Sequence, residues 1–183
     1  MNLPNKLTLT RIILVPVFMI FVSLTSLDSI VDGNFNATFY LLAGIVFAAA
    51  SFTDYLDGHL ARKWHMVTDF GKFADPLADK CLVMAALCWF VETGDMMGWV
   101  LAAVLLREFA VSGMRLIAVE KGRVIAAGWS GKVKTASTMV CICLILFGIP
   151  HWLNLVCQGV ILVTTVYSGV EYFVKNWDVF SEK

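Results

Sequence analysis

Charged residues are scarce in this sequence, and neither sign predominates. Lys and Arg together number 14 in 183 residues, and Asp and Glu also number 14. The net charge of zero points to no particular partner, and we expect no nucleic acid among the partners. Hydrophobic residues make up 59% of the chain, and the mean hydropathy is +0.78. This balance predicts an integral membrane protein with one domain over residues 1–183.

The residue patterns of common metal and redox motifs are missing as well. The five cysteines form no C-x-x-C pair and fall in apolar runs, so we interpret them as small apolar side chains. The three histidines are too scattered to form a ligand cluster. No A-x-A cleavage site follows the first apolar stretch. We therefore interpret that stretch as a retained first helix and not as a signal peptide.

Apolar runs of membrane-spanning length are what the sequence does contain. A helix needs about 20 predominantly apolar residues to cross the hydrocarbon core. The runs that approach this length are 7–27, 37–56, 73–92, 96–118, 133–150 and 152–174. The predicted fold is therefore all-α, a polytopic membrane protein with six transmembrane helices. The second and third runs reach full length only by including aspartates, which we expect to project beyond the hydrocarbon or to line a wet cavity.

The distribution of basic residues between the runs indicates an orientation. Thirteen of the fourteen lie in the N-terminal segment, in the connections 57–80 and 115–134, or in the C-terminal tail. The segments 25–36, 92–96 and 149–152 contain none. Since basic residues collect on the cytoplasmic side of membrane proteins, both termini and both basic connections are predicted to be cytoplasmic.

Four aspartates stand out because of their spacing. Asp54 and Asp57 are three residues apart, and Asp75 and Asp79 are four residues apart. On a helix, either spacing places both side chains on one face. Two such faces turned toward each other would bring four carboxylates to one point, where they repel unless they are neutralised. Mg²⁺ or Mn²⁺ suits such a cluster, because hard cations prefer carboxylate ligands and also bind phosphate oxygens.

The residues around these aspartates complete a longer pattern. Gly58 and Ala61 leave space beside the first pair, Arg62 offers a bidentate fork for phosphate, and Gly71 precedes the second pair. The whole reads D-x2-D-G-x2-A-R-x8-G-x3-D-x3-D. It resembles the signature of the CDP-alcohol phosphotransferase family at all eight defining positions. The opening Pro4-Asn5-Lys-Leu7-Thr8 and the segment Gly131-Lys132-Val-Lys134-Thr135 also resemble segments of bacterial members of this family.

This resemblance implies a reaction. The family transfers a phosphatidyl group from CDP-diacylglycerol, a membrane lipid, to an alcohol and releases CMP. The likeness is greatest to members that use glycerol 3-phosphate as the acceptor. Inositol phosphate, serine and phosphatidylglycerol remain alternative acceptors. The resemblance also implies a homodimer in the bacterial inner membrane, with the active site on the cytoplasmic side.

Roles for individual residues follow from the resemblance. Two Mg²⁺ or Mn²⁺ ions would be held by Asp54, Asp57, Asp75 and Asp79, and Asp79 would also take the proton from the acceptor hydroxyl. The CDP group would be bound by Asn5, Thr8, Gly58, Ala61, Arg62 and Gly71.

The acceptor phosphate needs cations of its own, and four basic residues are candidates. These are Arg107, Arg115, Lys132 and Lys134. Arg107 is followed by Glu108 in the middle of an apolar run. The two could form an internal ion pair that fixes the helix, or Arg107 could line a polar cavity and contact phosphate. Lys132 and Lys134 precede an apolar run and could serve only as a topological anchor.

A protein of a different class could also use clustered aspartates. A divalent-cation transporter would need polar groups that continue across the membrane. No polar stripe links the motif to the segments predicted on the far side. The transporter is therefore the remote alternative.

Overall fold

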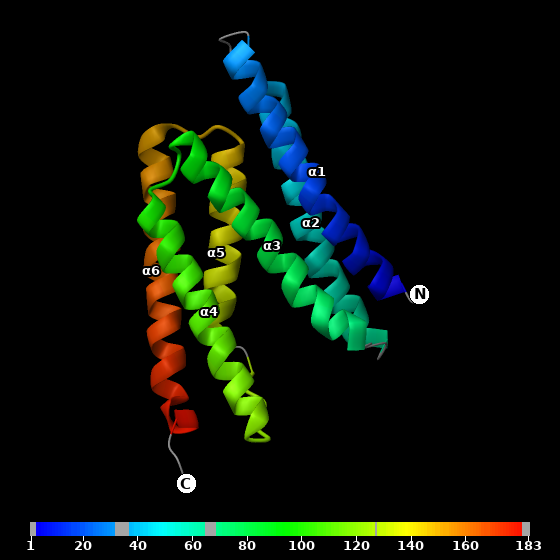
Figure 1. Cartoon of the computed structure of the whole chain (residues 1–183), viewed down its shortest axis with the longest axis vertical. Helices are drawn as coiled ribbons and strands as arrows, with labels where there is room; N and C mark the ends of the chain where they lie inside the picture. The colour runs from blue at the N-terminus through cyan, green and yellow to red at the C-terminus, as the bar shows by residue number, and fades with distance from the viewer. Residues whose placement is uncertain (1–2, 32–36, 65–68, 127, 181–183) are drawn as a thin grey trace. The chain divides into compact units, whose positions relative to one another are not determined.

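The computed structural model describes residues 3–31, 37–64, 69–126 and 128–180, and these are helical apart from short turns (Figure 1). Side chains are described for all residues except 1–9, 11, 26–37, 39, 54–76, 78–79, 127 and 181–183. The elements are α1 (Leu3–Val31), α2 (Ala37–Trp64), α3 (Asp69–Thr93), α4 (Gly98–Glu120), α5 (Trp129–Leu146), α6 (His151–Lys175) and the short 3₁₀ helix η1 (Trp177–Phe180). The prediction of an all-α chain with six long helices is confirmed over the described residues.

Two helix boundaries differ from the prediction in ways that affect the site. The connection expected over 57–80 shrinks to 65–68, because α2 continues to Trp64 and α3 begins at Asp69. Alanine, leucine, arginine and lysine in this stretch are good helix formers, so the helix persists after the apolar run ends. α5 begins at Trp129, before the expected start at 133. Lys132 therefore lies within the helix together with Lys134, and not ahead of it.

Two of the described helices have the length and composition of a membrane span. These are α5 and α6. Shorter apolar stretches occur within α1 and α2, at Ile12–Thr25 and Tyr40–Thr53. The crossing of a membrane by all six helices stays a prediction.

The chain divides into two compact units. The first comprises residues 1–89 with 142–148, and the second comprises 90–141 with 149–183. In the first unit α1 packs along α2, and the buried rings of Phe18 and Phe47 lie 6.0 Å apart between their centroids. Gly44 lets α2 approach the end of α5 closely, since a Cβ there would lie 3.4 Å from the Leu146 Cβ. Such close approach is typical of small residues in helix interfaces.

The second unit packs α4 against α6 and η1. Its apolar core contains Val111, Met114 and Ala118 from α4 with Tyr172 and Val179 from the C-terminal part of the chain. Gly122 follows α4 with φ of +71°, a left-handed conformation that glycine adopts without strain. Arg123 donates its backbone N–H to the Ala118 carbonyl at 2.8 Å, which completes a common helix-ending motif.

A buried amide network fixes the opposite end of this unit. Gln158 on α6 accepts the backbone N–H of Met97 at 3.0 Å and donates to the Asp95 carbonyl at 3.0 Å. Asn154 donates to the same carbonyl at 2.8 Å. The turn between α3 and α4 is thereby held on α6 by groups that would otherwise be buried without partners.

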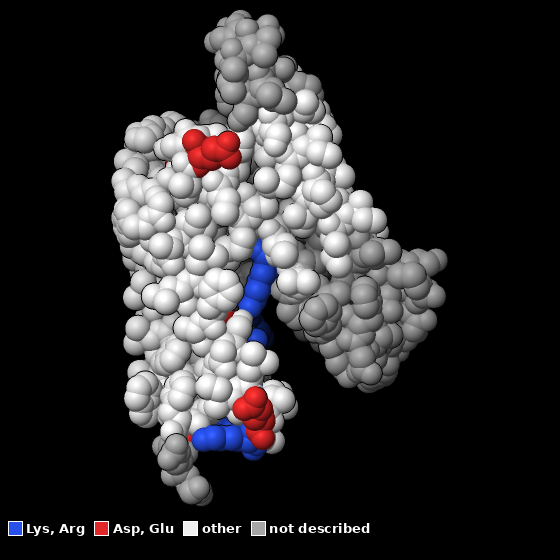
Figure 2. Space-filling view, in the orientation of Figure 1, with Lys and Arg blue, Asp and Glu red and all other residues white. Residues whose placement is uncertain are grey.

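Both ends of the second unit carry charged side chains on the surface. Figure 2 shows acidic side chains at the end that carries the α3–α4 turn, and side chains of both signs at the opposite end. The visible flank of α6 between the two ends is uncharged. At the mixed end, Lys121 donates to the Val179 carbonyl at 2.7 Å, and Arg123 pairs with Asp178.

Candidate functional site

The aspartates of the motif lie on two consecutive helices. Asp54 and Asp57 belong to the C-terminal half of α2, and Asp75 and Asp79 to the N-terminal half of α3. Only residues 65–68 separate the two helices. The helical spacing on which the metal-site prediction depends is therefore confirmed, and each pair shares a helix face. The four side chains lie outside the described part, so their convergence stays a prediction.

The residues predicted to contact the CDP group are carried by the same part of the chain. Their positions are at the start of α1 (Asn5, Thr8), in the C-terminal half of α2 (Gly58, Ala61, Arg62) and at the start of α3 (Gly71). These side chains also lie outside the described residues, and their roles stay predictions.

A buried ionic cluster in the second unit joins α4 to α5. The Oε1 atom of Glu108 accepts Arg107 Nη1 at 2.8 Å and Lys134 Nζ at 2.7 Å. The side chains are 14% exposed for Arg107, 13% for Glu108 and 6% for Lys134. Counted over these three side chains, the cluster carries one net positive charge. Buried ions are tolerated when they are paired, and an excess of one sign favours a counter-ion.

The Arg107 side chain is positioned by two glycines. A Cβ at Gly169 on α6 would lie 3.2 Å from Arg107 Cγ, and a Cβ at Gly131 on α5 would lie 3.5 Å from Arg107 Nη2. The Arg107 Nε atom is buried and has no hydrogen-bond partner among the described residues. The aliphatic stem of Arg107 therefore lies against α6, while the guanidinium group reaches the start of α5.

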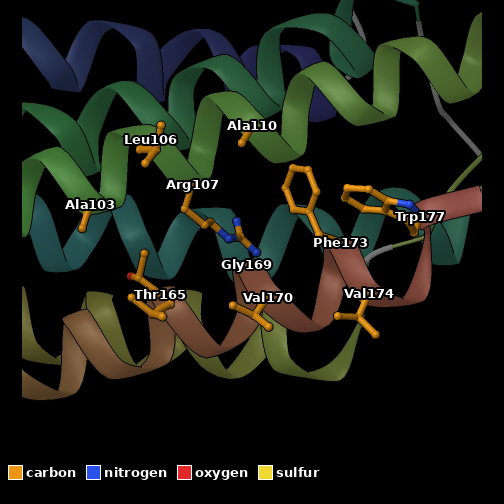
Figure 3. Close-up of a pocket in the computed structure, with 11 residues that line it drawn as sticks. Ala103, Leu106, Arg107, Ala110, Thr165, Gly169, Val170, Phe173, Val174 and Trp177 are labelled. Carbon is orange, nitrogen blue, oxygen red and sulfur yellow. The ribbon is translucent and has the colours of Figure 1, made fainter. Parts of the chain in front are cut away.

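The pocket beside the Arg107 stem is a groove between α4 and α6 of about 420 Å³. Figure 3 shows Arg107 reaching from α4 toward Gly169, with Phe173 and Trp177 farther along the same groove. Apart from Arg107 and Thr165, its lining is almost wholly apolar. The stem of Arg107 therefore faces this apolar groove and its polar end turns to Glu108. The polar cavity considered for Arg107 stays a prediction.

The remaining basic candidates lie apart from this cluster. Lys132 is exposed, although it is only two residues from the buried Lys134. Arg115 donates from Nε to the Tyr172 hydroxyl at 3.1 Å, and its guanidinium carbon lies 5.6 Å from the centroid of that ring. The internal ion pair considered for Arg107 and Glu108 is confirmed, and it includes Lys134 as a third member. The proposed contacts with an acceptor stay predictions.

Comparison with known protein families assigns the chain. A family model described as CDP-alcohol phosphatidyltransferase matches residues 1–170. The chain belongs to this family. The match covers the aspartate motif, the ionic cluster and most of α6, so both units contribute to the family's domain.

Individual relatives extend the similarity over nearly the whole chain. A Bacillus subtilis protein named CDP-diacylglycerol–glycerol-3-phosphate 3-phosphatidyltransferase is 44% identical over 97% of this chain and 96% of its own length. Proteins of the same name from Pseudomonas fluorescens and Shigella flexneri are both 35% identical. The match with the Pseudomonas fluorescens protein covers 97% of this chain and 91% of that protein. The match with the Shigella flexneri protein covers 93% of this chain and 92% of that protein.

Several residues that shape the site had no signal in the sequence. Gly169 lies in an apolar run, and nothing in its neighbours indicates that an arginine from another helix packs on it. Tyr172 is an aromatic residue near the end of an apolar run, and it is the partner of Arg115. Gln158 is one polar residue in an apolar helix. In this family member, such contacts become visible only when the helices are packed.

The packing of Arg107 on Gly169 can be tested with a matched pair of substitutions on α6. Gly159→Ala adds a Cβ where no atom lies within 4 Å, so we expect a gain of about 0.5–1 kcal/mol in the free energy of unfolding from helix propensity. Gly169→Ala adds a Cβ at 3.2 Å from Arg107 Cγ, so the gain should be cancelled or reversed by crowding. Thermal unfolding of the two variants in detergent measures the difference. Equal gains would show that the Arg107 stem does not pack there.

Proposed function

We propose that this protein transfers the phosphatidyl group of CDP-diacylglycerol to glycerol 3-phosphate, giving phosphatidylglycerolphosphate and CMP. It thereby serves the synthesis of anionic phospholipids. The observation that carries the proposal is the near full-length similarity to relatives named for this reaction, at up to 44% identity in the Bacillus subtilis protein. The aspartate motif, complete at eight positions on two helices, supplies the chemistry that the reaction needs.

The proposed reaction is a single displacement at phosphorus. A primary hydroxyl oxygen of glycerol 3-phosphate forms a bond to the phosphorus of the phosphatidyl group. The bond from that phosphorus to the bridging oxygen breaks, and this oxygen leaves as part of CMP. The hydroxyl proton passes to the Asp79 carboxylate. Asp79 lies one helical turn after Asp75, so it can act on the acceptor while the other aspartates engage the donor.

The donor set suits a pair of divalent cations. Asp54, Asp57, Asp75 and Asp79 supply only carboxylate oxygens, which are the preferred ligands of Mg²⁺ and Mn²⁺. The ions would clamp the pyrophosphate oxygens and neutralise the charge that grows on the leaving phosphate. The aspartates provide the negative charge that holds the ions, and Gly58 and Ala61 leave room for the nucleoside beside them.

The acceptor phosphate is assigned to the ionic cluster of the second unit. Arg107 and Lys134 are the two basic candidates that are buried together, and charge-assisted hydrogen bonds are strongest when water is excluded. Arg115 already engages Tyr172, and Lys132 is exposed. We therefore assign the central role to Arg107 and Lys134, and a peripheral one to Lys132 and Arg115.

The apolar helices support a place in the membrane. Two of the described helices have the length and composition of a membrane span, and CDP-diacylglycerol is itself a lipid whose chains the bilayer can hold. We propose a multi-pass protein of the bacterial inner membrane, with both termini and the active site on the cytoplasmic side. We also propose a homodimer, because the family to which the chain belongs is expected to form homodimers. The orientation places the aspartates where a soluble acceptor meets a lipid donor.

The acceptor is the part of the proposal that needs the sharpest test. Purified protein should be incubated with CDP-diacylglycerol and each of glycerol 3-phosphate, glycerol, serine, inositol phosphate and phosphatidylglycerol, with CMP release as the readout. We expect release with glycerol 3-phosphate to exceed that with any neutral acceptor by at least about tenfold, since one charge-assisted hydrogen bond contributes about 1.5–3 kcal/mol. Preference for another acceptor would be compatible with the family assignment and would refute glycerol 3-phosphate as the substrate. Cation transport without CMP release would favour the transporter.

Loss of a metal ligand should stop the reaction without preventing folding. We expect Asp54→Ala, Asp57→Ala and Asp75→Ala each to abolish CMP release, because a ligand is lost while repulsion among the acids is relieved. Asp178→Ala is the matched control. It removes an aspartate from an exposed ion pair with Arg123, and such pairs contribute little. EDTA should stop the unmodified enzyme, and Mg²⁺ or Mn²⁺ should restore it. Full activity in chelator would contradict metal dependence.

Asp79→Asn should behave differently from the ligand variants. The amide keeps the shape of the side chain and cannot accept the proton. We expect kcat to fall by ~10²–10⁴-fold, the usual contribution of a general base, with KM for CDP-diacylglycerol changed little. Steady-state kinetics with each substrate varied in turn measures both constants. A rise in the donor KM with kcat retained would show that Asp79 binds the donor and is not the base.

A further inference from the structure

Glu108 lies at the centre of the ionic cluster, and the roles proposed above leave it unused. Its Oε1 atom is within 2.8 Å of Arg107 Nη1 and 2.7 Å of Lys134 Nζ. Because both nitrogens contact one oxygen, they are close enough for a single phosphate group to touch both side chains. We infer that Glu108 is a positioning residue, which holds Arg107 and Lys134 together as a two-point receptor for the acceptor phosphate. The inference rests on the proposed function and deepens it.

The two cations would not stay together without the carboxylate. Two positive charges held this close to each other repel strongly when they are shielded from water. Arginine and lysine side chains are long and flexible, so they would separate in the absence of a shared acceptor. Glu108 offsets this repulsion before any substrate arrives. The receptor is thereby organised in the free protein, which lowers the entropy that phosphate binding must overcome.

Both cations keep donors for a ligand. A guanidinium group has five N–H donors and an ammonium group has three, and the bonds to Glu108 Oε1 take one from each. Arg107 Nε is buried and has no hydrogen-bond partner among the described residues. Gly131 lies beside Arg107 Nη2, and a Cβ at Gly131 would lie 3.5 Å from that atom, which is an ordinary van der Waals contact.

A purely structural role is the competing explanation. In that case Glu108 only fastens α4 to α5, and removing its charge lowers stability without favouring one substrate over the other. A purely electrostatic view makes a third prediction. Removing a negative charge from the cluster should then strengthen phosphate binding and lower the acceptor KM. The positioning role alone predicts a higher acceptor KM with an unchanged donor KM.

The test compares Glu108→Gln with Glu171→Gln. Glutamine keeps the shape of Glu108 and cannot neutralise the repulsion between the two cations. Glu171 pairs with Lys175 on α6, outside the proposed site, and serves as the matched control. We expect Glu108→Gln to raise KM for glycerol 3-phosphate by ~10-fold or more and to leave KM for CDP-diacylglycerol within about twofold. The control should change neither constant. An unchanged or lower acceptor KM, or equal changes in both constants, would overturn the inference.

A double-mutant cycle with Lys134→Met checks that Glu108 acts through its neighbours. In the Lys134→Met background we expect Glu108→Gln to raise the acceptor KM by less than about threefold, since the pair it would position is already broken. Full additivity of the two effects would overturn the inference. If Glu108→Gln yields no folded protein, Glu108→Asp takes its place. Aspartate keeps the charge on a shorter side chain. An unchanged KM for glycerol 3-phosphate in this variant would then refute the positioning role of Glu108.

A binding measurement separates this inference from the proposed function. The increase in thermal stability with added glycerol 3-phosphate, or with inorganic phosphate, is recorded for the unmodified protein and for Glu108→Gln. We expect stabilisation of the unmodified protein that needs ~10-fold more ligand in the variant. No CMP release from glycerol 3-phosphate by the unmodified protein would refute the proposed function, and the inference with it. CMP release together with equal stabilisation of both proteins would refute the inference alone.

Discussion

The cost of burying charge is the constraint on which the second unit depends. An isolated ion removed from water costs several kcal/mol, and a chain so rich in apolar residues offers few partners. Arg107, Glu108 and Lys134 meet this constraint together, with each side chain less than 15% exposed and one carboxylate oxygen contacting both cations. Because Lys134 comes from α5 and the other two from α4, the pairing also determines how these helices lie against each other.

The same constraint explains the glycines and amides around the cluster. Gly169 has no side chain where the stem of Arg107 passes, and a Cβ there would crowd the Cγ atom at 3.2 Å. At the other end of the unit, Gln158 and Asn154 donate hydrogen bonds to the Asp95 carbonyl in the α3–α4 turn. The paired polar groups around the cluster and the turn thus share hydrogen bonds, as a low-dielectric environment favours, whereas Arg107 Nε has no partner among the described residues.

The proposed chemistry asks for two separate sources of positive charge. The pyrophosphate of the donor and the phosphate of the acceptor are both anionic, and cations engaged by one cannot fully serve the other. The aspartate motif would meet the first need by holding divalent ions. The buried arginine and lysine would meet the second directly, through hydrogen bonds that discriminate a phosphate-bearing acceptor from a neutral one. This division gives each set of residues a distinct expected effect on the kinetics.

Local rules were enough to determine the helices and the family. The apolar runs predicted six helices because the hydrogen bonds of a helix join residues close in sequence. The eight-position motif indicated the family because all of its residues lie between 54 and 79, a stretch of 26 residues. Hydropathy marks only where an apolar run ends, at 56, whereas α2 continues on its helix-forming residues to Trp64, as the helical spacing of the aspartates requires. Only the packed structure decided that Lys134 is buried with Glu108 while Lys132 is exposed, and that Arg115 engages Tyr172. These contacts join residues 26 and 57 positions apart. Such pairings depend on how whole helices pack, which no local pattern in the sequence specifies.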